Sequence, residues 1–309
     1  MSSVKISVVI PTYNRSELLR NTLVALHHQT LDPALFEVVV VDDGGSDDSE
    51  AVVRSFADSL NVKYFWQEDE GFRAGKARNI GTAIASGDYV VYIDTGVLLG
   101  STTLQTHLET HEASAYPTVM IGYVYGFEVD DATIEGLMTS VDHEDTDATI
   151  EYLHAADALD IRESQYADLG ENITSWPAPF DIFWTCHVSA ERDELLKAGL
   201  FDESFTSWGG EDVDLGVRLF QRNNLFLMDR AARSFHWPHV KEVSDLKESS
   251  ASAADRIHSK YNLWTTSFYG RDLQNEKYSL NKVIKISREH AARASRPAHA
   301  PAPSFDEAV

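Results

Sequence analysis

Two neighbouring carboxylates, Glu211 and Asp212, stand where side chains could move a proton. They occur in SWGGEDVDLGVRL, after two glycines and before Val213 and Val217 at helical spacing. A carboxylate at the start of an anchored helix could take a proton from a hydroxyl, and glycines let the backbone approach a ligand. Carboxylates at this position are often only helix caps, which is the alternative. The preceding Trp-Gly-Gly favours a role of these carboxylates in proton transfer over a role as helix caps.

Asp94 is a third carboxylate that could do chemistry. It lies in VVYIDTGVLLG, where Asp94-Thr95-Gly96 matches the tripeptide that carries the catalytic aspartate of aspartic proteases. The same place could hold the Asp-x-Asp metal clamp of a nucleotide-sugar enzyme, except that Gly96 replaces the second carboxylate. The secondary structure around Asp94 decides between these interpretations.

Strands and helices alternate along the first half of the chain. The expected strands are Lys5–Ile10, Val38–Val41, Val62–Trp66 and Tyr89–Ile93, and the clearest helices between them are Ser16–His28 and Ala74–Ala85. This alternation predicts an α/β domain with a mostly parallel twisted sheet and helices on both faces. Because aspartic proteases are all-β, the protease interpretation of Asp94 is excluded.

Polar residues follow three of these strands. Pro11 to Asn14 end the first strand, Asp42-Asp43 end the second, and Asp94 ends the fourth. Ligands of open α/β sheets bind at the carboxyl ends of the strands, so we expect these residues to meet around one ligand. The turn after the first strand has no glycine and the chain has no Walker loop, which excludes the two common glycine-rich nucleotide motifs.

Composition narrows the class of protein. The chain has 309 residues, 43% hydrophobic and 24% charged, and a net charge of −23. This charge opposes binding to nucleic acid or anionic lipid. No run approaches the ~18 apolar residues of a membrane span. A single cysteine, Cys186, excludes an internal disulfide and fits a cytoplasmic protein.

Five motifs together resemble the family 2 glycosyltransferases. ISVVIPTYNR, VVVDDGGSDDS, GFRAGKARNIG, the strand ending at Asp94 and FDESFTSWGGEDVDLGVRL occur in the order of that family. The nearest likeness is to its galactosyl- and N-acetylgalactosaminyltransferase-like subset, including chondroitin-polymerase-type domains, and it covers residues 4–126 and 180–240. The resemblance implies a GT-A fold. It also implies inverting transfer of a sugar from a UDP-sugar to a hydroxyl of a glycan or small molecule.

The resemblance divides the chain into four segments. Residues 1–126 would bind the nucleotide sugar, and residues 179–290 would complete the same GT-A domain with its acceptor and catalytic half. Between them, residues 127–178 are acidic and weakly helical. This insert is either a solvated excursion or a lid over the acceptor. Residues 291–309 are rich in Pro and Ala and are expected to be a disordered tail.

The donor base would be held at the ends of the first two strands. Pro11 and Tyr13 could present a backbone edge and an aromatic ring to a flat base, unless Tyr13 is a core residue. By the resemblance, Asp43 accepts a hydrogen bond from the N3–H of a pyrimidine; its alternative is a turn residue. Uracil and thymine both carry this N3–H, so UDP and dTDP both remain open.

Three cations near a helix start could contact the diphosphate. Arg73 matches a nucleotide-contacting position of similar galactosyltransferases and is the preferred candidate. Lys76 and Arg78 are weaker candidates, because a solvated helix face explains them as well. Asn79 and Gly81 are expected to be packing residues.

The second half supplies the acceptor site and the base. Trp208 offers a flat face to a sugar, and Gly210 allows a close approach of the backbone. In similar inverting enzymes the first acid of the pair, here Glu211, binds the acceptor, and the second, here Asp212, is the catalytic base.

A divalent cation is the expected cofactor. Asp94 remains at the position of the metal clamp, and His236 matches a metal-binding histidine of similar transferases, although a lone histidine is more often a polar residue with an ordinary partner. Because Gly96 removes one carboxylate, Mn²⁺ or Mg²⁺ should bind only weakly before the donor arrives.

Two other functions remain open. A nucleotide-sugar-binding protein that has lost catalysis would explain Gly96. A sugar-1-phosphate nucleotidyltransferase would have a related fold, but it needs a glycine-rich basic loop after the first strand, and PTYNRSE is not such a loop.

Overall fold

The computed structural model describes residues 3–126, 141–237, 246–270 and 279–294. Within these residues eight strands form one sheet in the order β3-β2-β1-β4-β7-β6-β8-β5. The strands are β1 (Ile6–Thr12), β2 (Phe36–Asp42), β3 (Val62–Trp66), β4 (Tyr89–Ile93), β5 (Val97–Leu99), β6 (Thr118–Tyr125), β7 (His187–Glu191) and β8 (Leu225–His236).

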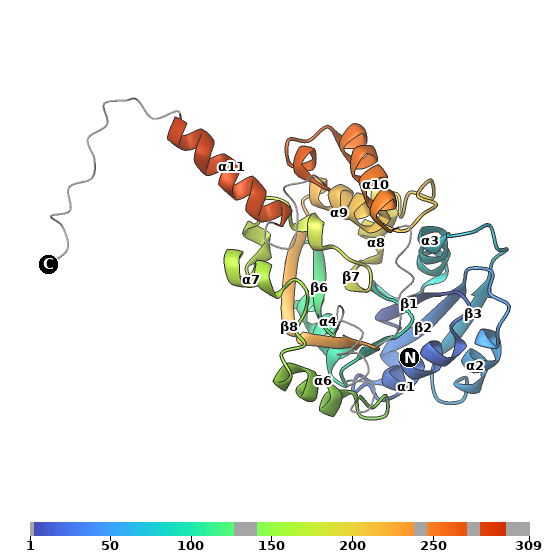
Figure 1. Ribbon diagram of the computed structural model, residues 1–309. Helices are drawn as coiled ribbons and strands as arrows, with labels where there is room; N and C mark the ends of the chain where they lie inside the picture. The colour runs from blue at the N-terminus through green and yellow to red at the C-terminus, as the bar shows by residue number, and fades with distance from the viewer. Residues whose placement is uncertain (1–2, 127–140, 238–245, 271–278, 295–309) are drawn as a thin grey trace, which may run out of the picture.

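Helices surround this sheet (Figure 1). The α-helices are α1 (Ser16–His27), α2 (Ser49–Ser55), α3 (Ala74–Ile84), α4 (Thr103–Ala113), α6 (Thr146–Ala155), α7 (Glu163–Leu169), α8 (Arg192–Ala198), α9 (Glu211–Gln221), α10 (Leu246–Tyr261) and α11 (Leu280–Ala294). Short 3₁₀ turns are η1 (Pro33–Leu35), η2 (Ile173–Ser175), η3 (Pro179–Ile182) and η4 (Thr265–Phe268). No helix in the described part of the chain is both long and apolar enough to cross a membrane.

The sheet is mostly parallel, as predicted. β3, β2, β1 and β4 run parallel to one another. β7 lies antiparallel between β4 and β6, and β8 continues parallel to β6. The short β5 then pairs antiparallel with β8. The carboxyl ends of β1, β2 and β4 therefore lie side by side, which places their polar residues at one edge.

Apolar residues cover both faces of the sheet, which explains the unbroken valine run of β2. Val8 of β1 belongs to one buried cluster with Leu23 of α1. The next residue, Val9, faces the other way and belongs to a second cluster with Ala77 of α3 and Val217 of α9. A strand buried on both faces has no polar alternation, because neither face meets water.

The described part of the insert packs on the sheet. Asp160 and Arg162 form an ion pair in which each side chain is only 1% exposed. Arg162 also donates to the carbonyl of Gly122 at 2.8 Å, and Asp160 accepts from the N–H of Val124 at 2.8 Å. The segment containing α6 and α7 is thus attached to β6. A role as acceptor lid stays a prediction, and residues 127–140 lie outside the described residues.

α11 lies beside α7, at the end of the described chain (Figure 1). It continues to Ala294, inside the segment that the sequence assigns to a tail, and residues 295–309 lie outside the described residues. A cavity of about 290 Å³ between α7, η2 and α11 is lined by none of the predicted site residues.

A chain of buried histidines joins α4 to the sheet. His107 Nδ1 lies 2.8 Å from Ser189 Oγ, and His107 Nε2 lies 3.0 Å from His187 Nε2. His111 Nε2 lies 2.7 Å from the same serine oxygen. A Cβ atom on Gly122 would lie 2.3 Å from the His187 ring, so glycine is required there. Burial lowers the pKa of His111 to about 4 and that of His187 to about 3.

These histidines should make the protein sensitive to acid. The unfolded state binds their protons below pH ~6.5, whereas in the folded state His111 binds its proton only near pH 4 and His187 only near pH 3. Stability is therefore fully present above the unfolded pKa and is lost as the pH falls. Each of His111 and His187 should cost about 2 kcal/mol of unfolding free energy between pH 7.5 and 5. Urea unfolding at both pH values measures this loss.

His111→Gln isolates one contribution. This variant should lose about 2 kcal/mol less than the wild type over the same pH interval. The comparison between the two proteins cancels carboxyl groups with raised pKa, which act in the opposite direction. An identical pH dependence in both proteins would contradict the assignment.

Candidate active site

The predicted base-binding residues gather at the ends of β1 and β2. Asp43 is buried, and its Oδ2 accepts the backbone N–H of Arg73 at 2.8 Å. Its Oδ1 accepts a hydrogen bond from Gln67. Burial raises the pKa of Asp43, and the hydrogen bonds from Arg73 and Gln67 oppose this rise. Asp42 has a different role, because it accepts the N–H of Gly45 at 2.7 Å and so closes the turn.

Tyr13 is not a core residue. Its side chain is 46% exposed, and its hydroxyl donates to Asp69 at 3.2 Å. The ring therefore remains available to a flat ligand beside Asp43. Pro11, at the end of β1, accepts a hydrogen bond from Thr95 at 2.9 Å, which joins this strand end to the turn after β4.

Arg73 and Lys76 stand at the start of α3. Arg73 caps the helix with its backbone and directs its guanidinium to the carbonyl of Phe72 at 3.0 Å. Lys76 forms an exposed ion pair with Glu70 at 2.9 Å. This contact agrees with the alternative in which Lys76 belongs to a solvated helix face. Asn79 is a packing residue, as expected, since its side-chain oxygen accepts the N–H of Phe201 at 2.8 Å.

Arg78 was a weaker candidate for the diphosphate site in the sequence analysis, yet it occupies the centre of the site. Its guanidinium is 2.8 Å from Asp94 Oδ1 and 3.3 Å from Glu211 Oε1. Burial opposes its charge, but Asp94 and Glu211 outweigh burial and raise the pKa of Arg78. Asp94, the predicted donor-side carboxylate, and Glu211, from the predicted catalytic pair, are thus joined through one cation. Its interpretation as a residue of a solvated helix face is wrong.

A sequence signal could have identified Arg78. In AGKARNIG it follows Ala77 and lies three residues from Gly75 and from Gly81, on the small, apolar face of the helix. Gly81 is packed so closely that a Cβ atom would lie 2.4 Å from Val9. An arginine on the buried face of a helix needs an anion, because an unpaired buried charge is very costly.

Asp212 lies in the first turn of α9. Its Oδ1 accepts the N–H of Val213 at 2.7 Å. Burial, with the charge of Glu211, raises the pKa of Asp212 to about 8. Glu211 Oε2 and Arg78 Nε are buried without a hydrogen-bond partner among the described residues. Polar atoms of this kind are the groups that a bound ligand or water would satisfy.

The fold itself requires glycine at position 210. Its φ of 94° is in the left-handed region, which favours glycine. A Cβ atom there would lie 2.6 Å from Cβ of Ala253 on α10. α10 therefore approaches the backbone closely at this position, and a role of Gly210 in sugar binding stays a prediction. Trp208, two residues earlier, is 52% exposed, and its contact with a sugar stays a prediction.

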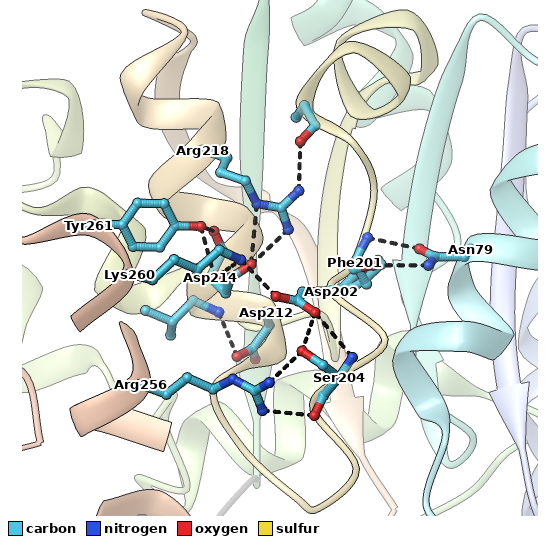
Figure 2. A network of polar contacts seen from close by, with 12 residues as sticks. Asn79, Phe201, Asp202, Ser204, Asp212, Asp214, Arg218, Arg256, Lys260 and Tyr261 are labelled. Atoms are coloured by element: carbon cyan, nitrogen blue, oxygen red, sulfur yellow. Dashed lines mark hydrogen bonds and ion pairs between the residues drawn. The ribbon is translucent and has the colours of Figure 1, made fainter. Parts of the chain in front are cut away.

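A polar network that sequence reasoning missed attaches α10 to α9 (Figure 2). Lys260 lies 2.8 Å from both Asp202 and Asp214. Asp214, which is fully buried, also accepts from Tyr261 at 2.8 Å and from Arg218 at 2.8 Å. Because Asp214 is two residues after Asp212, this network fixes the helix that carries the predicted base.

The two predicted metal ligands lie near the same turn. β5 pairs with β8 so that His236 is opposite Val97, and the N–H of Trp237 donates to Gly96 at 2.7 Å. Gly96 has a φ of 95°, a conformation that disfavours the missing aspartate. No group of three His, Cys, Asp or Glu residues that could hold a metal occurs in the described ranges. The pair fits a cation only if the donor supplies further ligands.

Similarities to known proteins agree with this arrangement. The model of the family "Glycosyl transferase family 2" matches residues 7–155. Validoxylamine A glucosyltransferase of Streptomyces hygroscopicus subsp. limoneus is 38% identical over 257 residues, which are 83% of this chain and 56% of that protein. Chondroitin synthase of Escherichia coli is 30% identical over 237 residues, 75% of this chain and 34% of that protein.

The fold has a counterpart among solved structures. Residues 1–349 of S. aureus TarS, solved in complex with UDP, superpose with a TM-score of 0.57 at 18% identity, covering 96% of this chain and 76% of that one. The chain spans little more than half the length of the validoxylamine enzyme that it matches. Asp43 and Asp94 lie at strand ends, and α9 begins with acidic residues. Together with these matches, these features show that the chain belongs to the family 2 glycosyltransferases and has their GT-A fold.

Proposed function

We propose that the protein transfers a sugar from a UDP-sugar to a hydroxyl of a glycan or small-molecule acceptor, with inversion at the anomeric carbon. The observation that carries this proposal is the Arg78 bridge. One guanidinium contacts Asp94 on the donor side and Glu211, the neighbour of the candidate base, on the acceptor side. Donor and acceptor would meet within reach of both.

Asp212 would act as the base. Its carboxylate takes the proton of the acceptor hydroxyl while the acceptor oxygen forms a bond to the anomeric carbon. The bond from that carbon to the diphosphate oxygen breaks on the opposite face, and UDP leaves with the electron pair. A pKa of about 8 makes Asp212 a stronger proton acceptor than an ordinary aspartate. Glu211 would hold the acceptor.

The remaining residues are assigned to the base of the donor, to its diphosphate and to a sugar on the acceptor side. Pro11, Tyr13 and Asp43 would hold the base, and Arg73 with the N–H groups at the start of α3 would face the diphosphate. Trp208 would stack on a sugar. Cationic groups are needed at the diphosphate because negative charge develops on the leaving oxygen.

Asp94 and His236 would hold a divalent cation together with the donor diphosphate. When bound, the cation would neutralise charge on the leaving group. Mn²⁺ is preferred over Mg²⁺ because it accepts imidazole. Since Arg78 already pairs with one oxygen of Asp94, the protein alone offers few ligands.

Cation binding is therefore expected to depend on the donor. Calorimetric titration of Mn²⁺ should show little binding to the protein alone and clear binding in the presence of UDP. Asp94→Ala and His236→Ala should each remove this UDP-dependent binding. His27→Ala, at an exposed histidine of α1, is the matched control. Transfer that is insensitive to EDTA would exclude the cation.

A nucleotide-sugar-binding protein without catalysis is the second candidate function, and Gly96 is the observation that favours it. Incubation with UDP-sugars and a panel of hydroxyl acceptors separates the candidates. Acceptor-dependent release of UDP, with an inverted product by NMR coupling, supports transfer. Binding without release supports the second candidate, and release of pyrophosphate would indicate a nucleotidyltransferase.

A further inference from the structure

Trp208 lies in a short loop whose two ends meet. The loop joins α8 to α9, and Phe205, three residues before Trp208, is buried at 5% exposure. Gly210, two residues after Trp208, packs closely on Phe205, because a Cβ atom on this glycine would lie 3.2 Å from Cε1 of the ring. Residues 206–209, which include Trp208, therefore form the tip of a closed loop.

Arg256 of α10 holds the first end of this loop (Figure 2). Its Nη1 donates to the carbonyl of Ser204 at 2.7 Å, and its Nη2 donates to the hydroxyl of the same residue. The guanidinium also lies 4.5 Å from the centroid of the Phe205 ring. A planar guanidinium with several donors can contact main chain, side chain and ring together, which a lysine ammonium cannot do. Arg256 thus fixes two consecutive residues of the loop.

The same face of α10 holds the other end and the preceding turn. Ala253 lies three residues before Arg256, and its Cβ would be 2.6 Å from a Cβ atom on Gly210. Lys260, four residues after Arg256, lies 2.8 Å from Asp202, which precedes the loop. Residues three and four apart share one face of a helix. Three contacts along one face of α10 therefore hold the loop in place.

One alternative is that Arg256 only attaches α10 to the rest of the protein. That attachment has other sources, because three apolar side chains of α10 are buried, namely Ala253, Ala254 and Ile257. Arg256 itself is exposed, and substitutions of exposed residues usually change stability little. The contacts of Arg256 therefore act on the loop more than on the attachment of the helix.

We propose that Arg256 is a positioning residue for the acceptor: by fixing Ser204 and Phe205, it holds Trp208 of the free protein where the acceptor sugar stacks. This inference rests on the proposed function, in which Trp208 contacts a sugar. A loop that is ordered before binding does not have to be ordered by the ligand, so less of the binding energy of the acceptor is lost. Arg256 acts through the loop and takes no part in the proton transfer.

Hydrogen exchange of the free protein shows whether Arg256 fixes the loop. Arg256→Met keeps the apolar part of the side chain and removes its donors. The backbone N–H groups of Ser204 and Phe205 both donate to Asp202, at 3.0 and 3.1 Å. Because the loop opens more often without Arg256, these two N–H groups should exchange roughly 10-fold faster in the variant than in the wild type.

Kinetics show whether the fixed loop serves the acceptor. With UDP-glucose as donor and methyl β-glucoside or another member of the hydroxyl-acceptor panel as probe, Arg256→Met should raise the KM for the acceptor roughly 10-fold. The value of kcat and the affinity for UDP should stay within about twofold of the wild type, because the proton transfer and the donor site are unchanged. Arg256→Lys, which keeps the charge and one donor group, should recover part of the KM.

A double variant shows whether Arg256 acts through Trp208. If it does, adding Arg256→Met to Trp208→Ala should produce no further rise in the KM for the acceptor. Phe205→Leu removes the ring below the guanidinium and keeps a buried apolar side chain. It should also speed the exchange and raise the KM, so the proposal can be tested even if Arg256→Met does not fold. A melting temperature for each protein shows whether it is folded.

The matched control is Arg192→Met. Arg192 also donates to main-chain carbonyls, those of Thr82 and Ala83 at the end of α3. Its replacement removes a similar arginine anchor from another part of the protein. The exchange of Ser204 and Phe205 and the KM for the acceptor should both remain as in the wild type.

The outcomes are distinct. Unchanged exchange in Arg256→Met would overturn the proposal, and so would faster exchange with an unchanged KM for the acceptor. A further rise in KM when Arg256→Met is added to Trp208→Ala would overturn the action through Trp208. If the wild type transfers to no acceptor of the panel, the proposed function fails, and the acceptor role of Arg256 fails with it. If the wild type transfers and Arg256→Met keeps a normal KM, only the role of Arg256 fails.

Discussion

Replacing Asp212 by asparagine is expected to lower turnover by roughly 10²- to 10⁴-fold while the affinity for UDP barely changes. The substitution keeps the shape of the side chain and removes the proton acceptor. Because Asp212 must be ionised to accept a proton, and its pKa is about 8, kcat/KM should rise with pH through about 8 in the wild type. This rise should be absent in Asp212→Asn.

The matched control is Asp193→Asn, at an exposed aspartate in the first turn of α8. It makes the same chemical change at the start of another helix and should leave turnover and its pH profile unchanged. Steady-state kinetics and UDP titrations on the three proteins measure both quantities. A near-normal rate in Asp212→Asn would remove the base assignment and, with it, the inverting mechanism derived from that base.

Replacing Arg78 by methionine should have the largest effect on stability. Removing one partner of a buried ion pair leaves an uncompensated charge and typically costs about 3–5 kcal/mol. Glu211 is buried and would lose the guanidinium that lies 3.3 Å away. The same loss should raise the pKa of Asp212 further, so the residual activity should require a higher pH.

Urea unfolding and a pH–rate profile test this expectation. Arg54→Met is the control, because Arg54 forms an exposed pair with Glu50 that should contribute less than about 1 kcal/mol. Arg78→Lys keeps the positive charge but loses the guanidinium that contacts Asp94 and Glu211 at the same time. This variant should retain more stability than Arg78→Met. An Arg78→Met protein as stable as the wild type would show that the bridge does not hold the site together.

The strands and helices in the first half of the chain could be predicted from the local pattern of apolar residues. Strands buried on both faces need continuous apolar runs, and Val38 to Val41 are such a run. The matching helices were also predictable, because α1 and α3 have regular apolar spacing. These elements fix the strand ends, so the positions of Asp43 and Asp94 at one edge of the sheet could be predicted.

The second half of the fold was less predictable. β8 extends from Leu225 to His236 and changes register where it passes Gly122 and Tyr123 of β6. β5 has three residues and pairs with this extension. A strand so short carries almost no pattern of its own, and its partner is far away in the sequence.

The sequence by itself determined the family and the parallel half of the sheet, and it made Glu211 and Asp212 the candidate acids. These properties depend on periodicity and on motifs, which are local. Only the tertiary structure decided that Arg78 joins Asp94 to Glu211 and that α10 packs on Gly210. Arg78 and Glu211 are 133 residues apart in the chain. Their contact exists because α3 and α9 contribute to the same buried hydrophobic cluster, which no local pattern encodes.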